Sequence, residues 1–346
     1  MFIKNIPISA LMRATQYTPV ILLLLLIFIT GCLLTKPELK APELNETEKA
    51  MGINVTKEGI KYLVDPAKVL PGGPQKGGIG VDRGIPAINK PKFISVQEAD
   101  TWIDDNELVM FLDYKGVKRI YPLQIMVWHE IVDDVVAGDP LLISYCPLCG
   151  SAIAYERNIN GKVVEFGTTG KLYNSDLVMY DDKTDTFWTQ IGGLGIIGPL
   201  TGTKLNPVSI DTLVWEDIKT THPDAQVLSK ETGFSRDYGR DPYGNYYFED
   251  YLLFPVEHES KKVSPKTVVF GIEVNDVFKA YKEEDIKELK EIDDVIDSVK
   301  VKITRDRAGI VKIINIDTGK EIIKERDFWF AWYAFHPDTQ LYQRTT

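Results

Sequence analysis

A long-period internal similarity is the sequence feature that most constrains how this chain folds. The apolar run Leu108–Leu112 has a counterpart in Val268–Ile272, and Val117–Tyr121 has a counterpart in Val277–Tyr281. Both pairs are separated by about 160 residues. Recurrence at a fixed, long spacing indicates that one supersecondary unit occurs twice in the chain.

The first copy has the pattern of a β-hairpin followed by a helix and a buried strand. Strands are predicted at Leu108–Leu112 and Val117–Tyr121, because short apolar runs on either side of a turn are typical of hairpins. Leu123–Val132 carries apolar residues at helical spacing, and Leu141–Tyr145 is a short apolar run typical of a buried strand. The related units are expected at about residues 107–146 and 266–304.

The predicted fold class is α+β, with one large β-rich domain at residues 77–346 that contains both units. A chain of 346 residues with 44% hydrophobic residues is long and apolar enough to bury a core. Its net charge of −10 excludes the general basic face that nucleic-acid binding requires. We therefore expect no nucleic-acid partner.

The two copies differ at residues that can carry chemistry. His129 in the first copy corresponds to Lys290 in the second, and Cys146 and Cys149 have no thiol counterpart there. Whatever the copies share would then be scaffold. The residues that differ would be the chemistry added to one copy of that scaffold.

The N-terminus has the pattern of an export signal. Two basic residues precede the apolar run Val20–Ile29, which is followed by Thr30-Gly31-Cys32. A run of this length before small residues is typical of a signal peptide and is short for a membrane-spanning helix. We therefore expect residues 1–31 to be a signal peptide and Cys32, in a lipobox-like context, to carry a lipid. The alternative is an uncleaved anchor, and either one places the folded part on the extracytoplasmic face of the cell membrane.

Residues 32–76 are interpreted as a lipid-anchored tether. They are rich in Pro, Glu and Lys and show no sustained helical or strand period. Such a composition is typical of a segment that does not form a core of its own. The membrane, reached through a lipid on Cys32, is the one partner that the sequence itself indicates.

Cys146 and Cys149 lie in the motif Tyr145–Ser151, directly after the predicted buried strand. Thiols at this spacing bind a metal, exchange electrons as a dithiol, or supply a nucleophile. A zinc ribbon needs a second cysteine pair, which this chain of three cysteines lacks. A thioredoxin-like site has its first cysteine at the start of a helix, whereas Cys149 here is followed by Gly150-Ser151 and then a strand-like run. A disulfide in a different fold stays open as a further interpretation.

Two of the four histidines are candidate partners for these thiols. His129 is interpreted either as a ligand or base, or as a residue of the helix surface. His336, in Phe-His-Pro-Asp, is interpreted either as a ligand or as part of a turn. The leading prediction is a transition-metal site formed by Cys146, Cys149, His129 and His336, and copper or zinc suits thiolate and imidazole ligands.

Two other functions use the same residues differently. In a thiol-dependent enzyme or redox protein, Cys146 would be the nucleophile or redox thiol and His129 its base. In a ligand-binding module, the cysteines would be a structural clip and the loops would hold a small molecule or protein. Lys171, Asn174 and Ser175 lie in a predicted loop, and Trp188 and Gln190 precede a glycine-rich loop. Polar residues in such loops either line a pocket or serve only to form the turn.

Five motifs follow one another along the chain. They are Trp128–Asp134, Tyr145–Ser151, Gly170–Ser175, Leu177–Asp181 and Phe330–Thr339. Together they resemble a family of exported prokaryotic proteins known only as a domain of unknown function, over about residues 80–342. The resemblance implies no particular activity. It implies that threonine can stand in place of Cys149, which gives more weight to Cys146 with His129.

Overall fold

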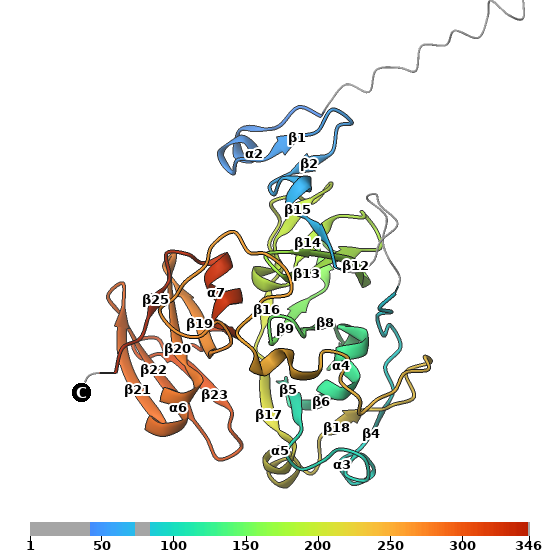
Figure 1. Ribbon diagram of the computed structural model, residues 1–346, viewed down its shortest axis with the longest axis vertical. Helices are drawn as coiled ribbons and strands as arrows, with labels where there is room; N and C mark the ends of the chain where they lie inside the picture. The colour runs from blue at the N-terminus through green and yellow to red at the C-terminus, as the bar shows by residue number, and fades with distance from the viewer. Residues whose placement is uncertain (1–41, 73–83, 345–346) are drawn as a thin grey trace, which may run out of the picture.

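Strands make up most of the regular structure, as the short apolar runs predict (Figure 1). The computed structural model describes residues 42–72 and 84–344. The predicted α+β, β-rich fold class is confirmed. The helices are short: α2 (Glu46–Ala50), α3 (Val96–Ala99), α4 (Leu123–His129), α5 (Trp215–Thr221), α6 (Glu283–Leu289), α7 (Trp329–Phe335), and the 3-10 turns η1 (Pro66–Lys68), η2 (Ile191–Gly193) and η3 (Gly244–Phe248).

The predicted signal peptide and Cys32 lie outside the described residues. Across residues 42–72 and 84–344, none of the helices has the length and apolar character needed to cross a bilayer.

The predicted hairpin is confirmed as β5 (Leu108–Tyr114) and β6 (Val117–Pro122). Lys115 and Gly116 both have positive φ, 51° and 81°, which suits a two-residue turn that follows the twist of the strands. The five-stranded sheet around this hairpin is completed by β17 (Asp211–Val214), β18 (Gln226–Leu228) and β4 (Phe93–Ser95).

The helix α4 is three residues shorter than the predicted helix Leu123–Val132. It ends because Glu130 adopts a left-handed conformation, with φ of 58°, and donates its N–H to the Met126 carbonyl at 2.7 Å. The chain then enters β7 (Ile131–Val136). Apolar residues recur on both sides of the helix end, at Val127 and at Ile131, and their spacing alone does not separate helix from strand.

The cysteine motif forms the turn of a second hairpin. The strands β8 (Asp139–Cys146) and β9 (Ser151–Glu156) are antiparallel, and Cys146 and Ser151 form their last pair. The buried strand predicted before the cysteines is confirmed, since Leu142 and Ile143 are fully buried. This sheet has the strand order β16-β9-β8-β7, with β16 at Pro207–Val208.

A seven-stranded sheet lies next to the cysteine hairpin. It contains β12 (Phe166–Tyr173), β13 (Asp176–Asp181), β14 (Phe187–Thr189) and β15 (Gly195–Ile197) in antiparallel order. Strands β13 and β14 pair directly, with Met179 opposite Trp188. A small separate hairpin is formed by β10 (Asn158–Ile159) and β11 (Lys162–Val163).

Part of the segment predicted as a tether takes part in this sheet. It forms β1 (Asn54–Val55), β2 (Lys61–Tyr62) and β3 (Leu70–Pro71), and β2 pairs with β15 while β3 pairs with β12. Ile53 and Val69 are buried on the way. Two buried apolar side chains thus help to attach this segment to the fold, although its sequence shows no helical or strand period.

The C-terminal part, orange and red in Figure 1, lies beside the central sheets. Its helix α7 buries Trp329 and Trp332 against the strands that precede it. The strands of this part are β19 (Val268–Val274), β20 (Val277–Lys282), β21 (Glu291–Ile296), β22 (Val299–Arg305), β23 (Val311–Asn315), β24 (Lys324–Phe328) and β25 (Gln340–Leu341).

Candidate metal centre

The hairpin turn between β8 and β9 brings the two thiols together. The Cys149 N–H donates to the Cys146 carbonyl at 3.2 Å, and Gly150 takes a positive φ of 61° that closes the turn. Cys146 is 2% exposed and Cys149 is fully buried. Both are free thiols, so the disulfide interpretation is not what this structure contains.

Asp176 joins the two thiols from another sheet. It is the first residue of β13, directly after the turn residues Asn174 and Ser175, whose φ angles are 52° and 63°. One carboxylate oxygen of Asp176 and the sulfur atoms of Cys146 and Cys149 all lie within 4.8 Å of one another. The three side chains form a buried group with the dimensions of a metal site.

The Asp176 carboxylate is held by the backbone on one side only. Its Oδ2 atom accepts N–H bonds from Gln190 and Ile191, each 3.0 Å long, whereas Oδ1 has no hydrogen-bond partner among the described residues. Burial raises the pKa of Asp176 to about 7, against the lowering effect of these backbone donors. A buried carboxylate with a free oxygen is costly unless a cation or a proton compensates it.

Gln190 fixes the position of the surrounding strands. Its Oε1 atom accepts the Ser151 hydroxyl proton at 2.7 Å, and its Nε2 donates to the Ser144 hydroxyl oxygen at 3.2 Å. Its own carbonyl accepts from the Tyr155 hydroxyl at 2.8 Å. Such surrounding hydrogen bonds hold the residues of a site in one orientation.

The electrostatic environment of the thiols favours a bound cation. Burial raises the pKa of Cys146, and a hydrogen bond with Cys149 opposes part of that shift. Burial also raises the pKa of Cys149, and the hydrogen bond with Cys146 raises that pKa still more. Two thiols that resist ionisation when alone become good ligands once a metal supplies positive charge.

Cys146 also faces a cavity of about 490 Å³. Apolar side chains form much of its wall, and Glu130, Lys171 and Tyr243 are its polar residues; Cys149 is not part of the lining. The Tyr243 hydroxyl donates to Glu130 Oε1 at 3.5 Å, and burial raises the pKa of Glu130 to about 8. The cavity gives a small molecule access to one thiol of the pair.

The structure places His129 close in sequence to this site but with other partners. Its Nδ1 atom lies 2.7 Å from the Pro86 carbonyl, and its Nε2 atom lies 2.6 Å from the Tyr238 hydroxyl. Both ring nitrogens are thus engaged, and His129 is not part of the group formed by the two thiols and Asp176. Its neighbour Glu130 lines the cavity instead.

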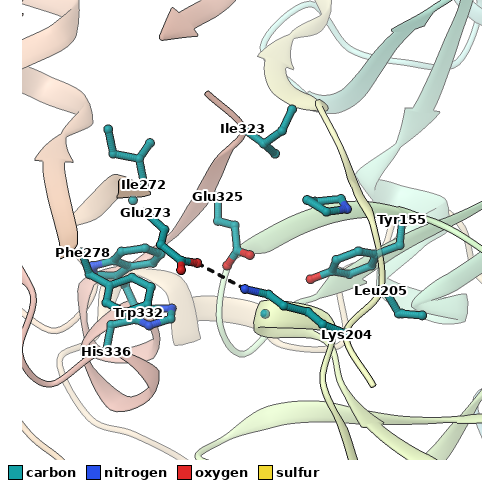
Figure 2. Close-up of a pocket in the computed structure, with 13 residues that line it drawn as sticks. Tyr155, Lys204, Leu205, Ile272, Glu273, Phe278, Ile323, Glu325, Trp332 and His336 are labelled. Carbon is teal, nitrogen blue, oxygen red and sulfur yellow. Dashed lines mark hydrogen bonds and ion pairs between the residues drawn. The ribbon is translucent and has the colours of Figure 1, made fainter. Parts of the chain in front are cut away.

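His336 lies in a different pocket (Figure 2). Its ring stacks on Phe278 with 4.0 Å between the centroids, and burial lowers its pKa to about 3. This pocket of about 90 Å³ is lined by Lys204 and Glu325 among others, and neither cysteine belongs to its lining. The structure therefore does not bring His336 to the thiols.

Sequence reasoning missed Asp176 and Glu130. The turn Asn174-Ser175 was visible as a polar loop, but nothing in the sequence shows that its next residue points to a hairpin of another sheet. Two of the residues predicted to line a pocket have different positions. Lys171 lines the cavity, whereas Gln190 contacts Ser151 and is not part of the cavity lining.

Comparison with known families gives one match. A family model described as "Protein of unknown function (DUF3179)" matches residues 82–324. The chain belongs to this family. Neither a curated protein nor a solved structure matches the chain. Cys146, Cys149 and Asp176 all fall inside the region shared with the DUF3179 family, whereas His336 lies beyond it.

Proposed function

We propose that this protein is an extracytoplasmic, lipid-anchored protein that holds a transition metal at Cys146, Cys149 and Asp176. The observation that carries the proposal is the convergence of three buried ligand atoms within 4.8 Å. The proposed ligand set keeps both cysteines of the sequence-based prediction, but it contains the Asp176 carboxylate in place of the two histidines, His129 and His336.

Three protein ligands leave a further coordination position for water or a substrate, as in catalytic metal sites. Cys146 lines the 490 Å³ cavity, so that position is expected to open onto it. Glu130 and Tyr243 line the same cavity and would contact a molecule that approaches the metal. The site then suits a small ligand that binds between metal and cavity wall.

Zinc is the metal that this donor set favours over copper. Thiolates are soft ligands that suit both Cu(I) and Zn²⁺, but a carboxylate oxygen is a hard ligand that Cu(I) avoids. Two thiolates and one carboxylate also carry three negative charges, which a divalent ion neutralises better than a monovalent one. We therefore propose zinc as the resident ion and copper as its competitor.

Metal analysis of the purified full-length protein tests this proposal. We expect one zinc ion per chain, lost in Cys146→Ser, Cys149→Ser and Asp176→Asn. Asp185→Asn, at an exposed turn of the same sheet, is the matched control and should keep the metal. His129→Gln should keep it too, since both ring nitrogens have other partners. A wild-type protein without stoichiometric metal after growth with zinc would refute the proposal.

A thiol-dependent enzyme is the second candidate, because Cys146 alone of the pair lines the cavity. In that case Cys146 would react with an alkylating agent faster than Cys149 in the metal-free protein, and added zinc would not slow the reaction. Protection of both thiols by stoichiometric zinc would favour the metal centre.

The chain also supports the proposal of two related units. Tyr121 donates to Asp134 Oδ2 at 2.8 Å, and Tyr281, 160 residues later, donates to Asp294 Oδ2 at the same distance. Glu130 and Lys290 both end a helix with a positive φ, 58° and 62°. The counterpart of Lys290 is therefore Glu130, and the sequence-based pairing of Lys290 with His129 is off by one residue. The proposed lipid on Cys32 has a separate test. It is the intact-mass measurement of membrane-extracted protein, compared with the Cys32→Ala variant.

A further inference from the structure

A second, independent site lies where the C-terminal part meets the sheet around β5. A cleft of about 140 Å³ is bounded there by Thr212 of β17 on one side. On the other side it is bounded by three basic residues, Lys287 of α6, Arg305 at the end of β22 and Arg326 of β24. The Val311 N–H donates to Asp211 Oδ1 at 3.3 Å and holds the two sides together.

The cleft carries a net positive charge. Its one acidic lining residue is Glu283, which accepts from Arg326 Nε at 3.0 Å and from Lys287 Nζ at 2.8 Å. Burial alone would raise the pKa of Glu283, but Arg326 and Lys287 hold it below its usual value. Three cations and one ionised carboxylate therefore leave two positive charges in the cleft.

Arg305 is the basic lining residue for which the described part of the chain offers no carboxylate partner. Among the described residues its side chain has no hydrogen bond and no ion pair. Its guanidinium lies against the bare backbone of Gly309, where an added Cβ atom would stand 2.9 Å from Nη2. Gly309, at φ of +90°, thus leaves the space that the guanidinium occupies.

Thr212 adds a neutral hydrogen-bonding group. The residue is 8% exposed, and its hydroxyl oxygen has no hydrogen-bond partner among the described residues. A buried hydroxyl without a partner is costly, so a native structure that keeps one usually supplies a partner from water or a ligand.

We propose that this cleft binds a doubly charged tetrahedral oxyanion, such as inorganic phosphate or sulfate. Guanidinium groups match oxyanions with paired, charge-assisted hydrogen bonds, and two arginines here face one small space. At about 140 Å³ the cleft has room for several water molecules. An anion of five heavy atoms fits that space, and two negative charges balance the net charge of the cleft.

The anion site is separate from the metal centre and does not depend on it. None of its lining residues lines the cavity at Cys146. A bound anion would contact strands on both sides of the cleft, and it would thereby link the C-terminal part to β17.

Isothermal titration calorimetry of the full-length protein tests the proposal, with phosphate and sulfate injected in separate titrations at constant ionic strength set by chloride. We expect saturable binding of both anions with one site per chain. Arg305→Gln should weaken binding about tenfold or more, because it removes a charged donor. Arg307→Gln is the matched control, since Arg307 is exposed and is not part of the cleft.

Thr212→Val keeps the shape of the threonine side chain and removes only its hydroxyl. It should weaken binding several-fold, and it provides a test that remains valid if Arg305→Gln fails to fold by circular dichroism. The proposal is overturned if neither anion binds above the chloride background. It is also overturned if a folded Arg305→Gln variant binds the anions as tightly as Arg307→Gln does. If Arg305→Gln does not fold, the same outcome in Thr212→Val overturns the proposal.

Discussion

The ring of Phe328 occupies the space in which a side chain on Gly150 would stand. A Cβ atom on Gly150 would lie 2.9 Å from the Phe328 Cζ atom. The Phe328 N–H also donates to the Cys149 carbonyl at 2.8 Å. The thiol turn is therefore held in place by β24, a strand of the C-terminal part.

We expect Gly150→Ala to destabilise the protein by about 2–4 kcal/mol, because it adds steric overlap to an unfavourable positive φ. Chemical denaturation measures the change. Gly161→Ala is the matched control: its φ is +80° but an added Cβ would contact nothing within 4 Å. Equal losses in the two variants would show that the contact with Phe328 is unimportant.

Glu130→Gln should reduce the dependence of stability on pH. Burial raises the pKa of Glu130 to about 8 in the folded protein, so the folded state binds a proton that the unfolded chain releases near pH 4.5. The wild-type protein therefore loses stability as the pH rises from about 4.5 to 8. Glutamine does not titrate and can still accept the bond from Tyr243.

Urea denaturation of the chelator-treated protein at pH 5.5 and pH 8 measures this effect. The difference in free energy of unfolding between the two pH values should be smaller in Glu130→Gln than in the wild type. Glu216→Gln, at an exposed position of α5, should leave the difference unchanged. An unaltered difference in Glu130→Gln would contradict the raised pKa.

Lys266 anchors the loop that walls the cavity. Its ammonium donates to the carbonyls of Tyr246, Glu249 and Tyr251 at 2.9, 3.2 and 3.3 Å. We expect Lys266→Met to expose this loop to limited proteolysis and to cost about 1–3 kcal/mol, because one buried and two part-buried carbonyl interactions lose their donor. Lys262→Met, at an exposed position, should resemble the wild type. Protease resistance equal to the wild type would count against this anchoring role.

His336→Phe should make the protein more tolerant of acid. Burial lowers the pKa of His336 to about 3, whereas the unfolded chain binds a proton near pH 6.5. The stability that the neutral ring contributes is complete above pH 6.5 and is lost as the pH falls toward 3. Phenylalanine keeps the stacking on Phe278 without this titration.

Thermal unfolding at pH 4.5 and pH 7 checks the expectation for His336. The melting temperature of His336→Phe should fall less between these values than that of the wild type, while its metal content stays unchanged. His258→Phe, at an exposed position, is the control. A loss of metal in His336→Phe alone would instead restore His336 as a ligand.

Local patterns predicted the elements well but could not predict which of them meet. The hairpin at Lys115-Gly116 follows from its turn residues, and the strand before Cys146 follows from an apolar run. Both signals lie within a few consecutive residues. Asp176 reaches the thiols only because β12, β13 and the turn at Cys146 converge in space, and no sequence period records that contact. His129 is close to the thiols in sequence, yet its two ring nitrogens contact Pro86 and Tyr238 instead.

The end of the predicted tether has a mechanical consequence. The strand β3 pairs Leu70 with Leu172 of β12, and β12 is joined by a two-residue turn to Asp176. Tension applied to the chain on the N-terminal side of β3 would be borne by the hydrogen bonds of this sheet. A pull on the chain before β3 would therefore reach Asp176 through β12 and the turn that follows it.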